Sequence, residues 1–133
     1  MAHLNEHGNF KISINSQTII LEAYGAWNYE TAIRFCHDFK QSVKKIESKP
    51  WASLIDLREW DLSTPDIWEA IDDLTIWSEQ HNQRYEATIY INNIQKTLLE
   101  QSQQNFENIS VQYFDQPELA YQWLANMNML KPD

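Results

Sequence analysis

Ser63 and Thr64 form a hydroxyl pair directly before Pro65, in the stretch WDLSTPDIWEA (60–70). Proline favours the first position of a helix, and the free N–H groups at a helix start attract anions. Ser63 and Thr64 are therefore a candidate anion or phosphorylation site. Flanking acidic residues would repel a phosphate there. The pattern favours a structural role, with Thr64 as an N-cap worth about 1 kcal/mol and Ser63 just outside the helix.

Four large or charged residues around this helix are candidates for an interface or a ligand-binding rim: Arg58, Trp60, Trp68 and Ile76. At about 100° per residue, Trp68 lies beside the helical arc that should face the sheet, and Ile76 lies almost opposite it. Off-stripe apolar groups can mark an interface. Alternatively, Trp68 folds over a loop near Trp60, and Ile76 is a single surface residue. For Arg58, an ion pair with Asp56 is favoured over catalysis.

No catalytic or metal-binding set emerges from the sequence. The chain has only two glycines, so it holds no Gly-rich phosphate loop. Its one cysteine, Cys36, excludes an internal disulfide and falls on the buried stripe of a helix. His3 and His7 have i, i+4 spacing, but they lie in a polar N-terminal segment. We therefore expect a non-enzymatic protein without a metal or cofactor.

Composition and charge narrow the class of protein. The 133 residues, 43% of them hydrophobic, suit one domain with its own core. A net charge of −9 makes nucleic acid or an anionic membrane surface an unfavourable partner. No apolar run approaches the roughly 20 residues of a membrane span, so the chain is not expected to be an integral membrane protein. The polar N-terminus lacks the apolar region of a signal peptide, and we expect a cytoplasmic protein.

Apolar periodicity predicts nine elements in the order β-β-α-β-α-β-α-β-α. The predicted strands are 10–15, 18–23, 51–57, 86–91 and 109–114, and the predicted helices are 29–47, 65–81, 94–106 and one from about 116 to 127. Strands alternating with helices imply an α/β domain with a mixed, mostly parallel five-stranded sheet. The first hairpin adds an antiparallel edge, and strand 51–57 is buried on both faces. Residues 1–8 are expected to be a flexible N-terminus, 9–127 the domain and 128–133 a frayed tail.

Residues at the ends of these elements carry further expectations. Asn28 is predicted to cap the first helix, and Gly25 to end the second strand. Asp115, three residues before Glu118, predicts a capping box for the last helix. The third helix is the weakest, with Ile94 and Leu98 on one face and many glutamines elsewhere. Its apolar stripe is the least defined of the four.

Three features in this order resemble the SpoIIAA-like branch of the STAS superfamily. They are Gly25 after the second strand, LIDLREWDLSTP (54–65) running from the central strand into a helix, and VQYFDQPELAYQWL (111–124). The resemblance spans roughly residues 10–125. It implies an α/β domain that mostly binds other proteins.

The resemblance also implies two modes of action. Anti-sigma-factor antagonists of this family are switched by serine phosphorylation at the helix start after the central strand. Pro65 and Asp66 depart from that pattern, which has a small residue and a glycine there. A related branch shares its fold with CRAL-TRIO lipid carriers, which hold an apolar ligand.

These observations lead to a main hypothesis and an alternative. The main one is a regulatory or protein-interaction module that acts through surfaces around the second helix. A homodimer through this helix and residues 58–62 would bury Trp68 and Ile76 against a second copy. The alternative is a binder or carrier of a small apolar, lipid-like ligand held under the aromatic-rich helices.

Overall fold

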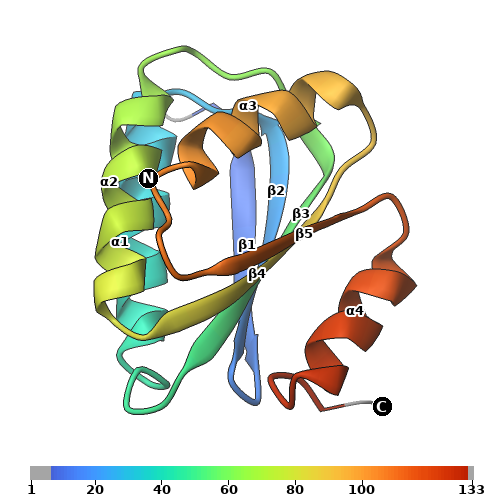
Figure 1. The fold of residues 1–133 in the computed structure, drawn as a ribbon. Helices are drawn as coiled ribbons and strands as arrows, with labels where there is room; N and C mark the ends of the chain where they lie inside the picture. The colour runs from blue at the N-terminus through green and yellow to red at the C-terminus, as the bar shows by residue number, and fades with distance from the viewer. Residues whose placement is uncertain (1–6, 132–133) are drawn as a thin grey trace.

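A five-stranded sheet with the strand order β1-β2-β3-β4-β5 organises the chain (Figure 1). The structure is a computed structural model that describes residues 7–131. The strands are β1 (Asn9–Asn15), β2 (Thr18–Ala26), β3 (Trp51–Asp61), β4 (Gln83–Ile89) and β5 (Ser110–Phe114). The helices are α1 (Tyr29–Val43), α2 (Ile67–Gln80), α3 (Asn93–Gln103) and α4 (Pro117–Asn126). The predicted element order is confirmed.

The sheet is mixed as predicted. β1 and β2 pair antiparallel at one edge, and every other neighbouring pair is parallel. β3 lies in the middle of the sheet, and its first five residues are all buried. The prediction of an internal third strand covered on both faces is therefore confirmed.

Two apolar cores lie on opposite faces of the sheet. The larger core joins β1, β2 and β3 to α1 and α2, and Leu99 of α3 packs against it. The smaller core joins β3 and β4 to α4, through residues such as Leu54, Ile89 and Leu124. Figure 1 shows α1 and α2 side by side on one face and α4 on the other. None of the helices in residues 7–131 has the length and apolarity needed to cross a bilayer.

Asn28 caps α1, as predicted. Its backbone is extended, and its side-chain oxygen accepts the N–H of Thr31. An N-cap residue adopts this conformation so that its side chain can bind an otherwise unpaired N–H of the first turn. The next helix starts differently.

Helix α2 begins two residues later than predicted, and Thr64 is not its N-cap. The N-cap is Asp66, whose side chain accepts no N–H of the helix. The Thr64 hydroxyl donates to the Asp66 carboxylate, so neither group serves the helix start. The backbone of this segment forms tight turns instead, in which Ile67 N–H donates to the Thr64 carbonyl.

Other ends also differ from the prediction: α1 ends at Val43 rather than 47, β4 is Gln83–Ile89 rather than 86–91, and α3 ends at Gln103 rather than 106. Gly25 has a φ of +69° but stays inside β2, which pairs with β3 as far as Ala26. The N-cap residue of helix α4 is Gln116 rather than Asp115, and the Gln116 side chain makes no capping hydrogen bond. β3 continues to Asp61, four residues beyond the predicted end.

Residues 127–131 are held against the sheet. The Met129 carbonyl accepts the Gln17 N–H at 3.0 Å and the Thr18 hydroxyl at 2.7 Å. Leu130 is buried, and the Lys131 N–H donates to Asn15. These contacts join the chain after α4 to the turn between β1 and β2, so residues 128–131 are not frayed.

We expect Gly8→Ala to lower the free energy of unfolding more than Gly25→Ala does. Both glycines have positive φ, +76° and +69°, which costs other residues about 1–2 kcal/mol. A Cβ at Gly8 would also lie 2.7–2.9 Å from Trp27 Cδ1 and the Tyr24 and Ala26 carbonyl oxygens. At Gly25 it would meet only the Gly8 Cα, at 3.3 Å. Urea denaturation measures both, and equal losses would show that close packing at Gly8 adds nothing.

Candidate functional site

A cavity of about 80 Å³ lies between the sheet and helices α1, α2 and α3. Apolar side chains from all these elements form most of its wall, among them Leu21, Phe35, Ile55, Leu74 and Leu99. One part of the wall is polar. There Glu86 and Gln83 of β4 meet Gln103 of α3, with the hydroxyl residues Thr75 and Ser78 of α2.

Glu86 is the centre of this polar part. Its side chain is only 8% exposed, on the face of β4 that the helices cover. One carboxylate oxygen accepts the Ser53 hydroxyl at 2.6 Å and Gln83 Nε2 at 3.3 Å. The other oxygen accepts Gln103 Nε2 at 2.6 Å. The Gln103 carbonyl oxygen in turn accepts the Tyr113 hydroxyl. Glu86 thus joins β3, β4, α3 and β5 in one hydrogen-bond network.

All the groups that donate to Glu86 are neutral. Among the ion pairs of the described residues, none includes Glu86. Removal from water disfavours the charged form of a carboxyl, whereas donated hydrogen bonds favour it. Burial is the stronger effect here and raises the pKa of Glu86, against hydrogen bonds from Ser53, Gln103 and Gln83 that lower it. The site therefore holds a buried acidic group without a cation to compensate its charge.

Trp60 and Trp68, which the sequence suggests as an interface or ligand rim, both line this cavity. Their rings meet edge to face, with centroids 6.2 Å apart. Trp60 is 5% exposed, and Trp68 is partly buried against the larger core. The interpretation that Trp68 packs near Trp60 is therefore confirmed. Trp68 therefore has a partner within the chain, because β3 extends far enough to bring Trp60 beside α2.

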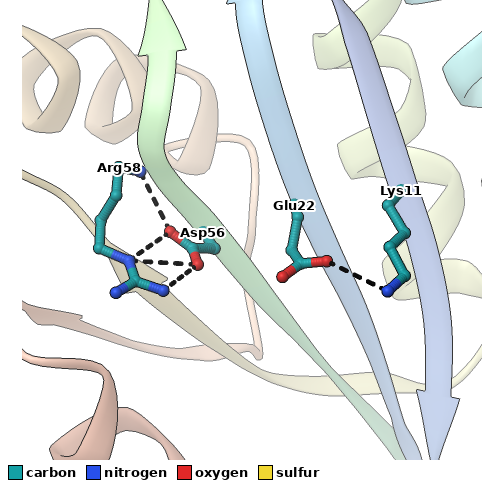
Figure 2. A network of polar contacts seen from close by, with 4 residues as sticks. All are labelled: Lys11, Glu22, Asp56 and Arg58. Carbon is teal, nitrogen blue, oxygen red and sulfur yellow. Dashed lines mark hydrogen bonds and ion pairs between the residues drawn. The ribbon is translucent and has the colours of Figure 1, made fainter.

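Ile76 and Arg58 lie away from the cavity. Ile76 is 45% exposed on α2. Arg58 lies on the opposite face of the sheet, where its guanidinium binds Asp56, with Nη2 2.7 Å from Oδ2 (Figure 2). The structural ion pair predicted for these residues is present. Figure 2 also shows Lys11 and Glu22 on the same face, with Nζ and Oε2 4.0 Å apart.

Ser63 connects two chain segments at the carboxyl end of the sheet. Its hydroxyl oxygen accepts the N–H of Trp27 at 2.9 Å, and Thr64 N–H donates to the Trp27 carbonyl at 3.0 Å. The loop before α2 is thereby fixed to the end of β2. Ser63, which was predicted to lie just outside the helix, makes the hydrogen bond to a buried residue. The exposed Thr64 uses its side chain to bind Asp66.

The other candidate reactive groups stay separate. Burial raises the pKa of the Cys36 thiol to about 11, and its sulfur lies 3.6 Å from the Ala70 carbonyl oxygen. Within residues 7–131, no three His, Cys, Asp or Glu side chains lie close enough together to hold a metal ion. His7 is held at the start of α1 by its backbone N–H, which donates to Asn28 and Thr31. His3 lies outside the described residues.

The sequence does contain a signal for the polar part of the cavity. In α3 the buried residues are Gln95, Ser102 and Gln103, and Leu99 packs on the core. Gln95, Leu99 and Gln103 recur every four residues, so they form a helical stripe with two amides in it. The predicted stripe through Ile94 was wrong, since Ile94 is 58% exposed. The stripe was missed because amides are usually assigned to the solvent face.

Two solved structures resemble the chain over most of its length. A DUF3478-family protein from Shewanella loihica PV-4 with a SpoIIAA-like fold aligns with a TM-score of 0.68 and 17% identity, covering 93% of this chain and 98% of that chain. This chain has the SpoIIAA-like fold. An anti-sigma factor antagonist from Mycobacterium paratuberculosis aligns with a TM-score of 0.58 and 9% identity, covering 89% and 94%. Comparisons with protein-family models and with curated proteins find no match.

We expect Glu86→Gln to stabilise this SpoIIAA-like domain increasingly as the pH rises. Below the ordinary carboxyl pKa of 4.5, folded and unfolded chains both hold Glu86 protonated. Above it the unfolded chain loses the proton first, so wild type loses stability until the pH passes the raised pKa of the folded state. Each unit by which the pKa is raised lowers the free energy of unfolding of wild type by about 1.4 kcal/mol.

Urea denaturation at pH 4.5, 6 and 8 measures this difference. Glu100→Gln, an exposed position on α3, is the matched control and should leave the pH profile unchanged. If the free energies of unfolding of Glu86→Gln and wild type differ by the same amount at all three pH values, burial does not raise the pKa of Glu86.

Ser63→Ala should cost this SpoIIAA-like domain more stability than Thr64→Ala. The first change removes the acceptor of the buried Trp27 N–H, which costs about 1–3 kcal/mol. The second removes an exposed hydrogen bond to Asp66, so a smaller loss is expected. Equilibrium denaturation compares the two variants. A larger loss for Thr64→Ala would restore Thr64 as the residue that secures the start of α2.

Proposed function

We propose that this chain is a non-enzymatic regulatory module that binds a protein partner at the carboxyl ends of β3 and β4. One observation carries the proposal. Three large aliphatic side chains are exposed in the segments that follow these neighbouring strands: Leu62 at 58% after β3, Ile91 at 61% after β4, and Ile94 at 58% in the first turn of α3. We call these three residues the apical patch. Open α/β sheets usually bind their ligands at this end.

Hydrogen bonds from one side chain to the backbone hold the apical patch in place. The Gln95 side chain donates to the carbonyl oxygens of Leu57 and Trp60 and accepts the Ile91 N–H. It therefore ties the start of α3 to the end of β3. A rigid surface loses less conformational entropy when a partner binds, so its exposed apolar area contributes more to affinity.

The chemistry of the described residues supports binding rather than catalysis. A nucleophilic thiol needs a lowered pKa, and that of Cys36 is raised. The Ser63 hydroxyl accepts a backbone N–H and donates to the Asp61 carbonyl at 3.3 Å, so its partners are backbone groups and not a base. The fold resemblance to an anti-sigma factor antagonist is consistent with a protein partner. Phosphorylation of Ser63 stays the alternative to its structural role.

A second copy of the chain is one such partner. The predicted homodimer through α2 loses Trp68 as a contact, since Trp68 packs on Trp60. Ile76 remains exposed, and Leu62 adds an exposed apolar residue at the end of the 58–62 segment. Self-association through these residues stays a prediction.

A second candidate function is the binding of a small apolar ligand, which the cavity favours. Its wall is mostly apolar and includes Trp60 and Trp68. An engineered apolar cavity of about 150 Å³ binds benzene, so a cavity of about 80 Å³ suits a ligand of few heavy atoms. A long acyl chain would require the helices to move. The lipid-like ligand of the sequence hypothesis is therefore replaced by a smaller one.

Replacing the apical patch with Leu62→Ser, Ile91→Ser and Ile94→Ser should weaken partner binding by about tenfold or more, because each buried aliphatic side chain contributes roughly 1.5–3 kcal/mol. Cross-linking and affinity purification from the source cells identify the partner. Sedimentation equilibrium of the purified chain detects a second copy. Titration of the purified partner then measures the loss for the triple variant.

The matched control is Ile14→Ser, Ile33→Ser and Leu119→Ser, three exposed aliphatic residues on β1, α1 and α4. This control should bind as wild type does. Equal losses in the two triple variants, or recovery of no protein whose binding depends on the apical patch, would contradict the proposed function.

A further inference from the structure

We infer that the cavity beside Glu86 binds a small alkylammonium ion, with the ammonium on the carboxylate and the short apolar chain among the aromatic rings. This inference rests on the second proposed function and names its ligand class. It starts from Glu86, the buried acidic group that the protein-interaction function does not use.

The hydrogen bonds to Glu86 prepare a charged carboxylate without neutralising it. Ser53, Gln83 and Gln103 all donate to it, and none of them carries charge. An ionised carboxylate has about four acceptor sites, so these three donors leave one site open. Buried carboxylates are normally paired with a cation. A ligand with N–H donors and a positive charge supplies both the missing donor and the missing charge.

The rest of the cavity is suited to a cation with an apolar tail. Six aromatic residues line it: Trp27, Phe35, Phe39, Trp60, Trp68 and Phe106. The faces of aromatic rings carry partial negative charge and attract an ammonium ion and the polarised C–H groups beside it. Within the cavity lining, no residue is Lys, Arg or His, so no side chain there repels a cation. An anionic ligand would meet Glu86 with no positive group to offset it.

Size limits the ligand further. A cavity of about 80 Å³ is roughly half the volume of one that holds benzene, which has six heavy atoms, so an alkylammonium of about three heavy atoms is the largest that suits it without rearrangement. Burial raises the pKa of Glu86, which records the cost of an unpaired charge there. A bound ammonium offsets that cost. The net charge of −9 also favours the approach of cations over anions.

Ethylammonium and ethanol provide a matched pair of probes for the test. They have the same number of heavy atoms, and only the first carries charge. An alkylamine, like the Lys side chain with its pKa of about 10.4, stays protonated at pH 8. Isothermal titration calorimetry and tryptophan fluorescence measure both affinities, since Trp27, Trp60 and Trp68 line the cavity.

Wild type should bind ethylammonium about tenfold or more tightly than ethanol, because hydrogen bonds to a charged group contribute more than neutral ones. Glu86→Gln should abolish this preference while still binding ethanol. Glu100→Gln, on the exposed side of α3, should keep the preference. Leu99→Phe, which fills the cavity, should weaken the binding of both probes. Leu119→Phe, on the surface, should leave the binding of both unchanged.

The outcomes separate this inference from the function on which it rests. Equal affinity of wild type for the two probes, or a preference that survives in Glu86→Gln, would overturn the ammonium inference and leave an apolar ligand site. Failure of wild type to bind either probe would overturn both. Should Glu86→Gln not fold, the preference of wild type and the weaker binding of both probes to Leu99→Phe decide the question.

Discussion

The handedness of the crossovers is the constraint on which the rest of this structure depends. The strands lie in the sheet in their order along the chain, so each parallel crossover moves in the same direction. Right-handed connections then place α1, α2 and α3 on one face. Among residues 7–131, α4 is the one helix on the other face, where it packs over β4 and β5. The crowded face therefore holds the cavity and Glu86, and the thinly covered face holds the Asp56–Arg58 and Lys11–Glu22 pairs.

Features that depend on neighbouring residues in the chain could be predicted from the sequence. Features that depend on which part of the sheet a helix covers could not. Asn28 caps α1 through contacts within four residues, and the alternation of β1 and β2 is visible in the chain. β3 was predicted to end at Leu57, because polar residues follow it. Those residues lie on the part of the sheet that α4 does not cover, so Arg58 remains solvated within a strand. Polarity there indicates an open sheet face and not the end of a strand.

The sequence predicted the tryptophans of the candidate site but not its buried carboxyl group. Trp60 and Trp68 stand out by size and by their position beside the α2 stripe, and both line the cavity. Glu86 opens an otherwise apolar strand pattern, where an acidic residue is ordinarily solvated. Its burial depends on Ser53 and Gln103, which come from β3 and α3. Partners more than 15 residues apart along the chain cannot be paired from periodicity alone.

The side-chain amides of Gln95 and Gln103 explain why the surrounding core does not fill the cavity. α3 is joined to the sheet largely by polar contacts, from Gln95 to β3 and from Gln103 to Glu86 and Thr88. In residues 7–131 no buried side-chain N or O atom lacks a partner, so this interface is satisfied without being apolar. Hydrogen bonds fix a distance and a direction, whereas apolar side chains slide together until space is filled. A helix positioned by amides therefore cannot settle closer to the sheet, and the space beneath Leu99 stays open.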